Sequence, residues 1–215
     1  FSKFAPDGTP TWVRHYGGDQ NDEITGIDID ANGDIVMAGQ YESSMNIGAI
    51  QLSHHGIVSN SYYFRLFFAM LNSDGIPQWA NGYAPSTARF TRSDWSGGVG
   101  FVSGGNFWTA AHFVGGRDFG NGAVGADNVN QYAFLQFDHD GNAVAEKHWQ
   151  AFQREANYMT MNGDNPIAGL IFATNSPVDF GGGALDSGLV YLAMDQTTTG
   201  LEHRWSKNFG GLTGS

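Results

Sequence analysis

A repeated string of strand-like sequence is the feature that most constrains the fold of this chain. Residues 1–12 read F-x-x-F-x-x-D-G-x-x-x-W, and residues 68–79 read F-x-x-L-x-x-D-G-x-x-x-W. The opening and its Asp-Gly pair recur over residues 134–141, and a looser copy runs over 191–205. A period of roughly 60 residues indicates a repeat architecture, in which each repeat is one supersecondary unit that packs against its neighbours.

A second landmark, [ND]-[IF]-G, follows the first at a fixed place in the period. It begins at Asn46, Asp118 and Asp179, each time between the last strand-like piece of a period and the next F-x-x-F. Two landmarks in a constant order indicate repetition more strongly than one does. They divide the chain, as one repeat region, into repeats at about 1–67, 68–133 and 134–190 and a partial repeat at 191–215.

Each period contains four strand-like pieces, which in the first period lie at 1–5, 11–16, 24–30 and 34–41. The chain has 31 Gly among 215 residues and 14% aromatic residues, a composition that favours short strands and tight turns. No segment with helical periodicity and caps occurs. We therefore predict an all-β fold of β-propeller blades: about three four-stranded antiparallel blades plus a half blade, as part of a larger propeller. Aromatic residues at 12, 79 and 149 are expected to fill the wedges between blades.

The order of the motifs resembles the bacterial SBBP-type β-propeller repeats. The first period carries Trp12, Tyr16 and the pair 17–18, the third carries DFGGG at 179–183, and the fourth carries Trp205. The resemblance covers nearly the whole chain and implies a propeller fold in a large secreted or cell-surface bacterial protein. The chain departs from the pattern at Ala145, where a Trp is expected, and over 153–166.

Charge and cysteine content exclude several classes of partner and site. Ten basic against 21 acidic residues give a net charge of −11, which repels nucleic-acid phosphates and anionic lipid. We therefore expect no nucleic-acid partner. No apolar run approaches the roughly 20 residues of a membrane-spanning helix, so no membrane span is expected. The absence of Cys excludes disulfides and thiolate metal sites.

One acidic segment resembles the start of a calcium loop. No cofactor is expected, and calcium is the alternative that this segment raises. Asp28, Asp30, Asn32 and Asp34 follow the pattern D-x-D-x-N-G-D, which places oxygen ligands at alternate positions. The twelfth position of the loop is Gly39 instead of Glu. A strand that ends in an Asn-Gly hairpin turn explains the same residues and is the favoured interpretation.

Two further candidates involve aromatic and histidine side chains. Tyr62, Tyr63, Trp95 and Trp108 are candidates for a face that stacks on sugars or binds protein, and packing between blades is the alternative. The pair 54–55 consists of two His residues that are able to bind a metal ion, but no carboxylate or third His is spaced to complete such a site.

Repetition of scaffold residues without a nucleophile motif or a phosphate-binding loop favours a non-enzymatic protein. We expect a secreted or cell-surface module for binding, adhesion or structural assembly. Its partners would be a protein or glycan ligand and further blades from the same or another chain. One alternative is a polysaccharide lyase or hydrolase with its site in the propeller channel. The other is a subunit of a larger extracellular assembly, which an incomplete ring of blades favours because open sheet edges invite pairing.

Overall fold

The described part of the chain is built from β-strands and turns, without a helix, in the computed structural model. The structure describes residues 1–53, 64–83, 94–126, 129–150, 153–173, 177–186, 188–198 and 200–210. Of the strand segments 153–157 and 169–173 it describes the backbone. The all-β prediction is therefore confirmed for these residues.

Three four-stranded antiparallel sheets form the body of the molecule, and the strand order in each sheet follows the chain. Sheet I contains β4 (Asp22–Ile29), β5 (Ile35–Tyr41), β8 (Arg65–Leu71) and β9 (Pro77–Tyr83). Sheet II contains β10 (Trp95–Phe101), β11 (Phe107–Val114), β14 (Asn130–Phe137) and β15 (Ala143–Gln150). Sheet III contains β16 (Gln153–Asn162), β17 (Asn165–Ala173), β20 (Gly188–Thr197) and β21 (Gly200–Asn208). A two-stranded half-sheet, β1 (Ser2–Phe4) and β2 (Pro10–Val13), precedes them.

Short strands are inserted between the second and third strands of every four-stranded sheet. They form a small hairpin in each case, and β3 (Gly17–Gly18) pairs with the first of these hairpins. The hairpins are β6 (Met45–Ile47) with β7 (Ile50–Leu52), β12 (Arg117–Asp118) with β13 (Ala123–Val124), and β18 (Val178–Asp179) with β19 (Ala184–Leu185).

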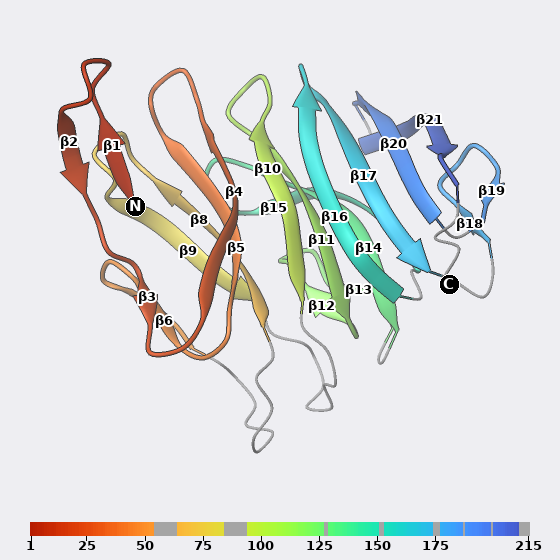
Figure 1. Ribbon diagram of the computed structural model, residues 1–215, viewed down its shortest axis with the longest axis horizontal. Coiled ribbons are helices and arrows are strands. Elements are labelled where there is room, and N and C mark those ends of the chain that lie inside the picture. The colour runs from red at the N-terminus through yellow and green to blue at the C-terminus, as the bar shows by residue number, and fades with distance from the viewer. Residues whose placement is uncertain are drawn as a thin grey trace.

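The sheets lie side by side in chain order, with the half-sheet at one end of the row and sheet III at the other (Figure 1). No sheet formed by the described residues closes on itself. Each four-stranded sheet takes its first two strands from one sequence repeat and its last two from the next, so the sheets are offset from the repeats. The F-x-x-F…D-G…W string is the second half of a sheet, and its Asp-Gly pair lies in the hairpin turn.

Three apolar layers between adjacent sheets form the core. Central strands are buried on both faces, which explains why β5 and β8 read as nearly continuous apolar runs although the sheets are antiparallel. Along each strand, alternate residues enter the layers on opposite sides. The layer between the half-sheet and sheet I includes Trp12, Met37 and Phe67. The layer between sheets I and II includes Phe68, Phe113 and Phe137, and the layer between II and III includes Trp108, Phe134 and Leu192.

The Trp of the repeat packs on the Asp-Gly turn of the next sheet. The Trp12 indole donates a hydrogen bond to the Ser73 carbonyl at 3.2 Å, and the Trp79 indole donates to the His139 carbonyl at 2.8 Å. A Cβ on Gly75 or Gly141 would lie within 3.0 Å of these indole rings. The predicted position of Trp12 and Trp79 between sheets is therefore confirmed, and the Gly of the turn is required by this contact.

The [ND]-[IF]-G landmark makes a second connection between sheets. Phe119 is 3% exposed and its ring lies 4.9 Å from that of Tyr83 in sheet I. Phe180, also 3% exposed, lies 5.3 Å from Trp149 in sheet II, in line with the expected position of Trp149. Both landmarks of the sequence thus serve contacts between neighbouring sheets.

Candidate functional site

An open hollow lies where hairpin turns from all three four-stranded sheets meet. Its volume is ≈ 870 Å³, and its lining includes the β4–β5 turn, the 102–105 and 163–164 turns, and His139 from the β14–β15 turn. Four carboxylates line it: Asp28, Asp30, Asp34 and Asp164. The hollow is therefore acidic, with one imidazole at its margin.

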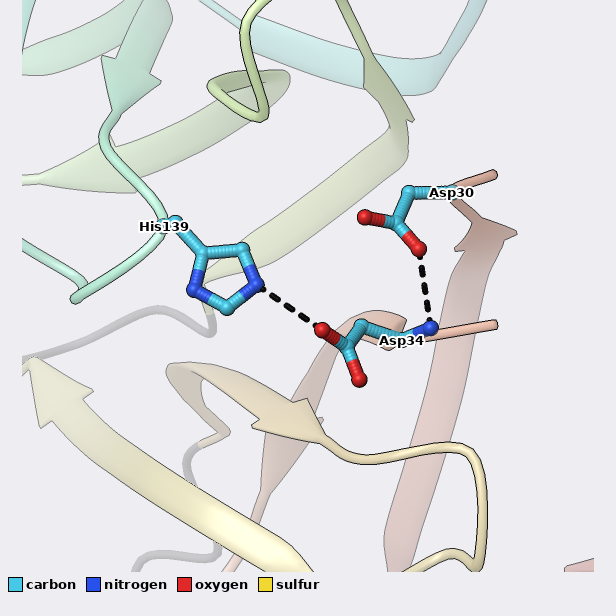
Figure 2. A group of neighbouring side chains, drawn as sticks. All are labelled: Asp30, Asp34 and His139. Atoms are coloured by element: carbon cyan, nitrogen blue, oxygen red, sulfur yellow. Dashed lines mark hydrogen bonds and ion pairs between the residues drawn. The ribbon is translucent and has the colours of Figure 1, made fainter. Parts of the chain in front are cut away.

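Asp30, Asp34 and His139 form the cluster that is drawn in Figure 2. Each offers one potential metal-ligating atom, and these atoms lie within 4.8 Å of one another. Asp34 Oδ2 lies 3.2 Å from His139 Nε2, an interaction that joins residues 105 positions apart in the chain. The His139 side chain is 42% exposed and that of Asp34 is 23% exposed, so water reaches the cluster.

The Asp30 carboxylate also closes the β4–β5 hairpin. Its Oδ1 accepts hydrogen bonds from the backbone N–H groups of Asn32 and Asp34, both at 2.9 Å. Asn72 and Asp138 accept the same pair of bonds in the turns of sheets I and II. The hairpin turn that the sequence favoured for this segment is therefore present.

Of the three carboxylates in the predicted calcium loop, Asp30 and Asp34 lie in the cluster and Asp28 does not. Asp28 Oδ2 accepts the Phe101 N–H at 2.8 Å, and the Asn32 side-chain amide donates to Asp30 Oδ2 at 3.2 Å. The third member of this cluster of potential metal ligands is His139. Sequence reasoning missed His139, because no local pattern places a residue of the β14–β15 turn beside the β4–β5 turn.

Trp79 explains how His139 is held. The indole hydrogen bond to the His139 carbonyl fixes the β14–β15 turn against sheet I. Asp34 lies in the first hairpin of that same sheet, so the repeat contact brings the imidazole to the carboxylate. The repeated D-G…W pattern predicts that the β14–β15 turn packs against Trp79. It does not predict that a His of that turn lies beside Asp34.

Two of the aromatic residues predicted to form a ligand-binding face are described: Trp108 is buried in the core and Trp95 is half-buried. Trp108 is 0% exposed, and its indole donates to the Gln196 side chain at 2.9 Å, so the stacking role proposed for it is wrong. Packing, the alternative interpretation, accounts for it because a buried ring cannot meet a sugar. Trp95 is half-buried, with its ring 6.0 Å from that of Phe64. Tyr62, Tyr63 and the pair 54–55 lie outside the described residues.

A groove runs along the first strands of the three four-stranded sheets. Its volume is ≈ 600 Å³, and β4, β10 and β16 line it. These strands approach closely, since a Cβ on Gly26 would lie 2.7 Å from Gly98 Cα. Asp28 is the one carboxylate among the described residues of its lining.

A fully buried ion pair lies apart from the hollow. Arg117 contacts both carboxylate oxygens of Asp94, at 2.8 and 2.7 Å, and both side chains are 0% exposed. Burial raises the pKa of Asp94, and the guanidinium of Arg117 opposes that shift. Asp94 also accepts the Val114 N–H at 3.3 Å, so the pair ties the residue before β10 to β11 and the small hairpin of sheet II. Its burial suits a structural role.

No family model and no curated protein matches this chain. Among the described residues, no helix has the length and apolar character needed to cross a bilayer.

Proposed function

We propose that this chain is a segment of a β-propeller that acts as a non-catalytic module for binding, adhesion or structural assembly in a secreted or cell-surface bacterial protein. Four-stranded antiparallel sheets that stand side by side in chain order support the blade interpretation. The resemblance to SBBP-type repeats supports a secreted or cell-surface location. The offset between sheets and repeats fits blades that are completed by a neighbouring repeat.

The observation that carries the proposal is an apolar face at the end of the row that no described residue covers. Trp205 and Phe209 are 42% and 57% exposed. Their equivalents earlier in the repeat series pack against the next sheet: Trp12 is 9% exposed and Tyr83 is 7% exposed, and Trp79 and Tyr16 are half-buried. We call Trp205, Phe209 and the neighbouring Tyr191, which is 42% exposed, the outer face of sheet III. A further sheet of the same kind fits this face, because it would present the turn and the small hairpin that cover the earlier ones.

The groove along the first strands does not favour an enzyme. Glycoside hydrolysis generally uses two carboxyl groups on opposite sides of the scissile bond. The described residues of the groove supply one, Asp28, and its Oδ2 already accepts the Phe101 N–H. A binding or assembly role requires no such pair.

Sedimentation velocity over a range of protein concentrations tests the assembly role. The chain is expected to self-associate through the outer face of sheet III, because covering Trp205 and Phe209 removes apolar area from water. The double variant Trp205→Ser/Phe209→Ser is expected to sediment as a monomer. A matched control is Ile76→Ser/Val144→Ser, which changes two side chains of similar exposure, 49% and 46%, outside that face and should associate like the unchanged chain.

A strict monomer of the unchanged chain at every concentration would overturn the assembly role. The binding role is tested separately on a glycan array, with and without calcium. Retention of a glycan class would support a carbohydrate ligand, and an array without signal in either condition would count against one.

A further inference from the structure

We propose that Asp30, Asp34 and His139 bind a divalent transition-metal ion of the Zn²⁺ class, which would tie the first hairpin of sheet I to the last hairpin of sheet II. The inference is independent of the propeller interpretation, since it concerns contacts between two described hairpins.

Two of the three potential ligands, Asp34 and His139, differ in residue type from the residues at the equivalent positions of the other turns. Five hairpin turns share one backbone pattern, in which the first residue of the turn exchanges hydrogen bonds with residues three and four positions later. The position of Asp34 is occupied in the other four turns by Thr9, Ile76, Asn106 and Asn142. The position of His139 is occupied by Pro6, Ala31, Ser73 and Ser103. Turn formation therefore accounts for Asp30, but it does not require a carboxylate at 34 or an imidazole at 139.

Asp30 is oriented before any ligand arrives. Its Oδ1 accepts two backbone N–H groups and its Oδ2 accepts the Asn32 amide. An ionised carboxylate offers about four acceptor directions, so Oδ2 retains one for an ion. Hydrogen bonds of this kind orient metal ligands in known sites and strengthen binding. The turn thus supplies the supporting contacts that a metal-binding carboxylate needs.

The imidazole and the second carboxylate are already at ligand separation. Asp34 Oδ2 and His139 Nε2 are 3.2 Å apart. Two ligands bound to Zn²⁺ at about 2.1 Å in tetrahedral geometry lie roughly 3.4 Å apart. Small side-chain rotations bring the Asp30 oxygen into the same sphere, since all three atoms lie within 4.8 Å. Water from the open hollow would take the remaining position.

The donor types select the ion. Calcium in proteins takes six to eight oxygen ligands, which one imidazole and two carboxylates do not provide. Imidazole with carboxylate suits Zn²⁺ and its neighbours in the first transition series. Two further carboxylates of the hollow are engaged: Asp28 accepts the Phe101 N–H, and Asp164 accepts the Ser103 N–H at 2.7 Å. They add negative charge around the ion without completing a calcium shell.

Calorimetric titration and thermal unfolding with Zn²⁺, Co²⁺ and Ca²⁺ test the site on the whole chain. Zn²⁺ at about 100 times its dissociation constant should raise the Tm by roughly 5–10 °C. Ca²⁺ should raise it by less than about 1 °C at the same concentration, because calcium prefers a shell of oxygen ligands. Bound Co²⁺ should show the intense visible absorption of a tetrahedral complex, a signature that a simple ion pair does not give.

His139→Ala and Asp34→Asn should each weaken Zn²⁺ binding at least tenfold. His148→Ala is the matched control, because His148 is 41% exposed and lies 3.6 Å from the Glu146 carboxylate but stands outside the cluster. Its Zn²⁺ affinity should equal that of the unchanged chain. The Tm of each variant without metal checks folding, and Asp34→Asn provides the test if His139→Ala lowers that Tm.

Three results would overturn the proposal. The first is that the unchanged chain binds no Zn²⁺ at millimolar concentration. The second is that His139→Ala and Asp34→Asn bind Zn²⁺ as tightly as the unchanged chain, which would assign the ion to other groups such as His54 and His55. The third is that Ca²⁺ stabilises the chain as much as Zn²⁺ does. None of these results bears on the outer face of sheet III.

Discussion

Gly8 and Gly141 occupy the same position in hairpin turns but have different surroundings. Both have a φ of 84°, a left-handed conformation that disfavours any residue with a Cβ. A Cβ on Gly8 would meet nothing within 4 Å, whereas one on Gly141 would lie 2.9 Å from the Trp79 ring. Gly8→Ala should therefore cost about 1–2 kcal/mol from backbone strain. Gly141→Ala should cost about 1–3 kcal/mol more, because the indole must move.

Urea unfolding of the two variants measures the difference. Equal losses of unfolding free energy would show that the contact between Trp79 and the Gly141 turn does not restrict the residue there. The comparison isolates the contact because both substitutions add one methyl group in the same backbone conformation.

The Asp179 carboxylate is expected to stabilise the folded chain by an amount that depends on pH. Hydrogen bonds from the Gly181 and Gly183 N–H groups, at 2.7 and 3.0 Å, lower its pKa below the usual value of 3.8. A lowered pKa in the folded state stabilises the fold above the unfolded pKa, and the contribution disappears as pH falls through the folded pKa. The Tm of Asp179→Asn should thus fall less than that of the unchanged chain between about pH 5 and pH 2. Asp19→Asn, at an exposed carboxylate outside this hairpin, is the control.

Local sequence explains why the turns could be predicted at residue scale and the cluster could not. An Asp three positions before the Gly of the turn accepts bonds from the N–H groups two and four positions later, so the roles of Asp30 and Asp138 could be predicted from the sequence. The approach of His139 to Asp34 depends on how sheet II packs on sheet I. No pattern within either turn contains that information, and the same is true of the burial of Trp108.

At the scale of elements, the small hairpins of sheets II and III each contact the preceding sheet through one aromatic side chain, Phe119 and Phe180. Phe119 contacts Tyr83 across the boundary between sheets I and II and also lies 5.4 Å from Phe113. Phe119→Ala removes a buried ring and should cost about 3–5 kcal/mol of unfolding free energy. Phe209→Ala removes a ring that is 57% exposed and should change stability by less than about 0.5 kcal/mol.

Chemical denaturation of both variants checks this contrast. A loss below about 1 kcal/mol for Phe119→Ala would mean that the small hairpin is not a structural contact. Phe209 is a suitable control because it is an aromatic residue of the same type at a sheet boundary that no described residue covers.

Element boundaries were predictable where the strand pattern is local. The four pieces of the first period correspond to β1, β2, β4 and β5, and the two landmarks mark the turns and small hairpins. The offset of the sheets from the repeats was harder to predict from the sequence, because it depends on the pairing of β5 with β8, which joins one repeat to the next. Residues 153–166 match the repeat poorly and still form β16 and the start of β17, since backbone hydrogen bonds do not require a particular side chain.

At the scale of the whole molecule, every four-stranded sheet packs on its neighbours in the row, so stability is a sum of sheet terms and boundary terms. Sheets I and II have neighbours on both sides. Sheet III has sheet II on one side and the outer face that contains Trp205 and Phe209 on the other. The repeat period predicts that the sheets pack in a row. It does not predict what covers the outer face of sheet III, because the same residues suit a sheet in a closed ring and a sheet in an open row.

Hydrogen exchange should reveal this asymmetry between the ends of the row. Amides of β20 and β21 are expected to exchange at least about tenfold faster than those of β8 and β9, since local opening is easier where no described residue packs on one face of the sheet. Mass spectrometry of peptides from sheets I and III, at low protein concentration, measures the ratio. Equal protection of the two strand pairs would contradict the assignment of the outer face as uncovered. If the chain associates through Trp205 and Phe209, raising its concentration should slow exchange in β20 and β21, and Trp205→Ser/Phe209→Ser should abolish that slowing.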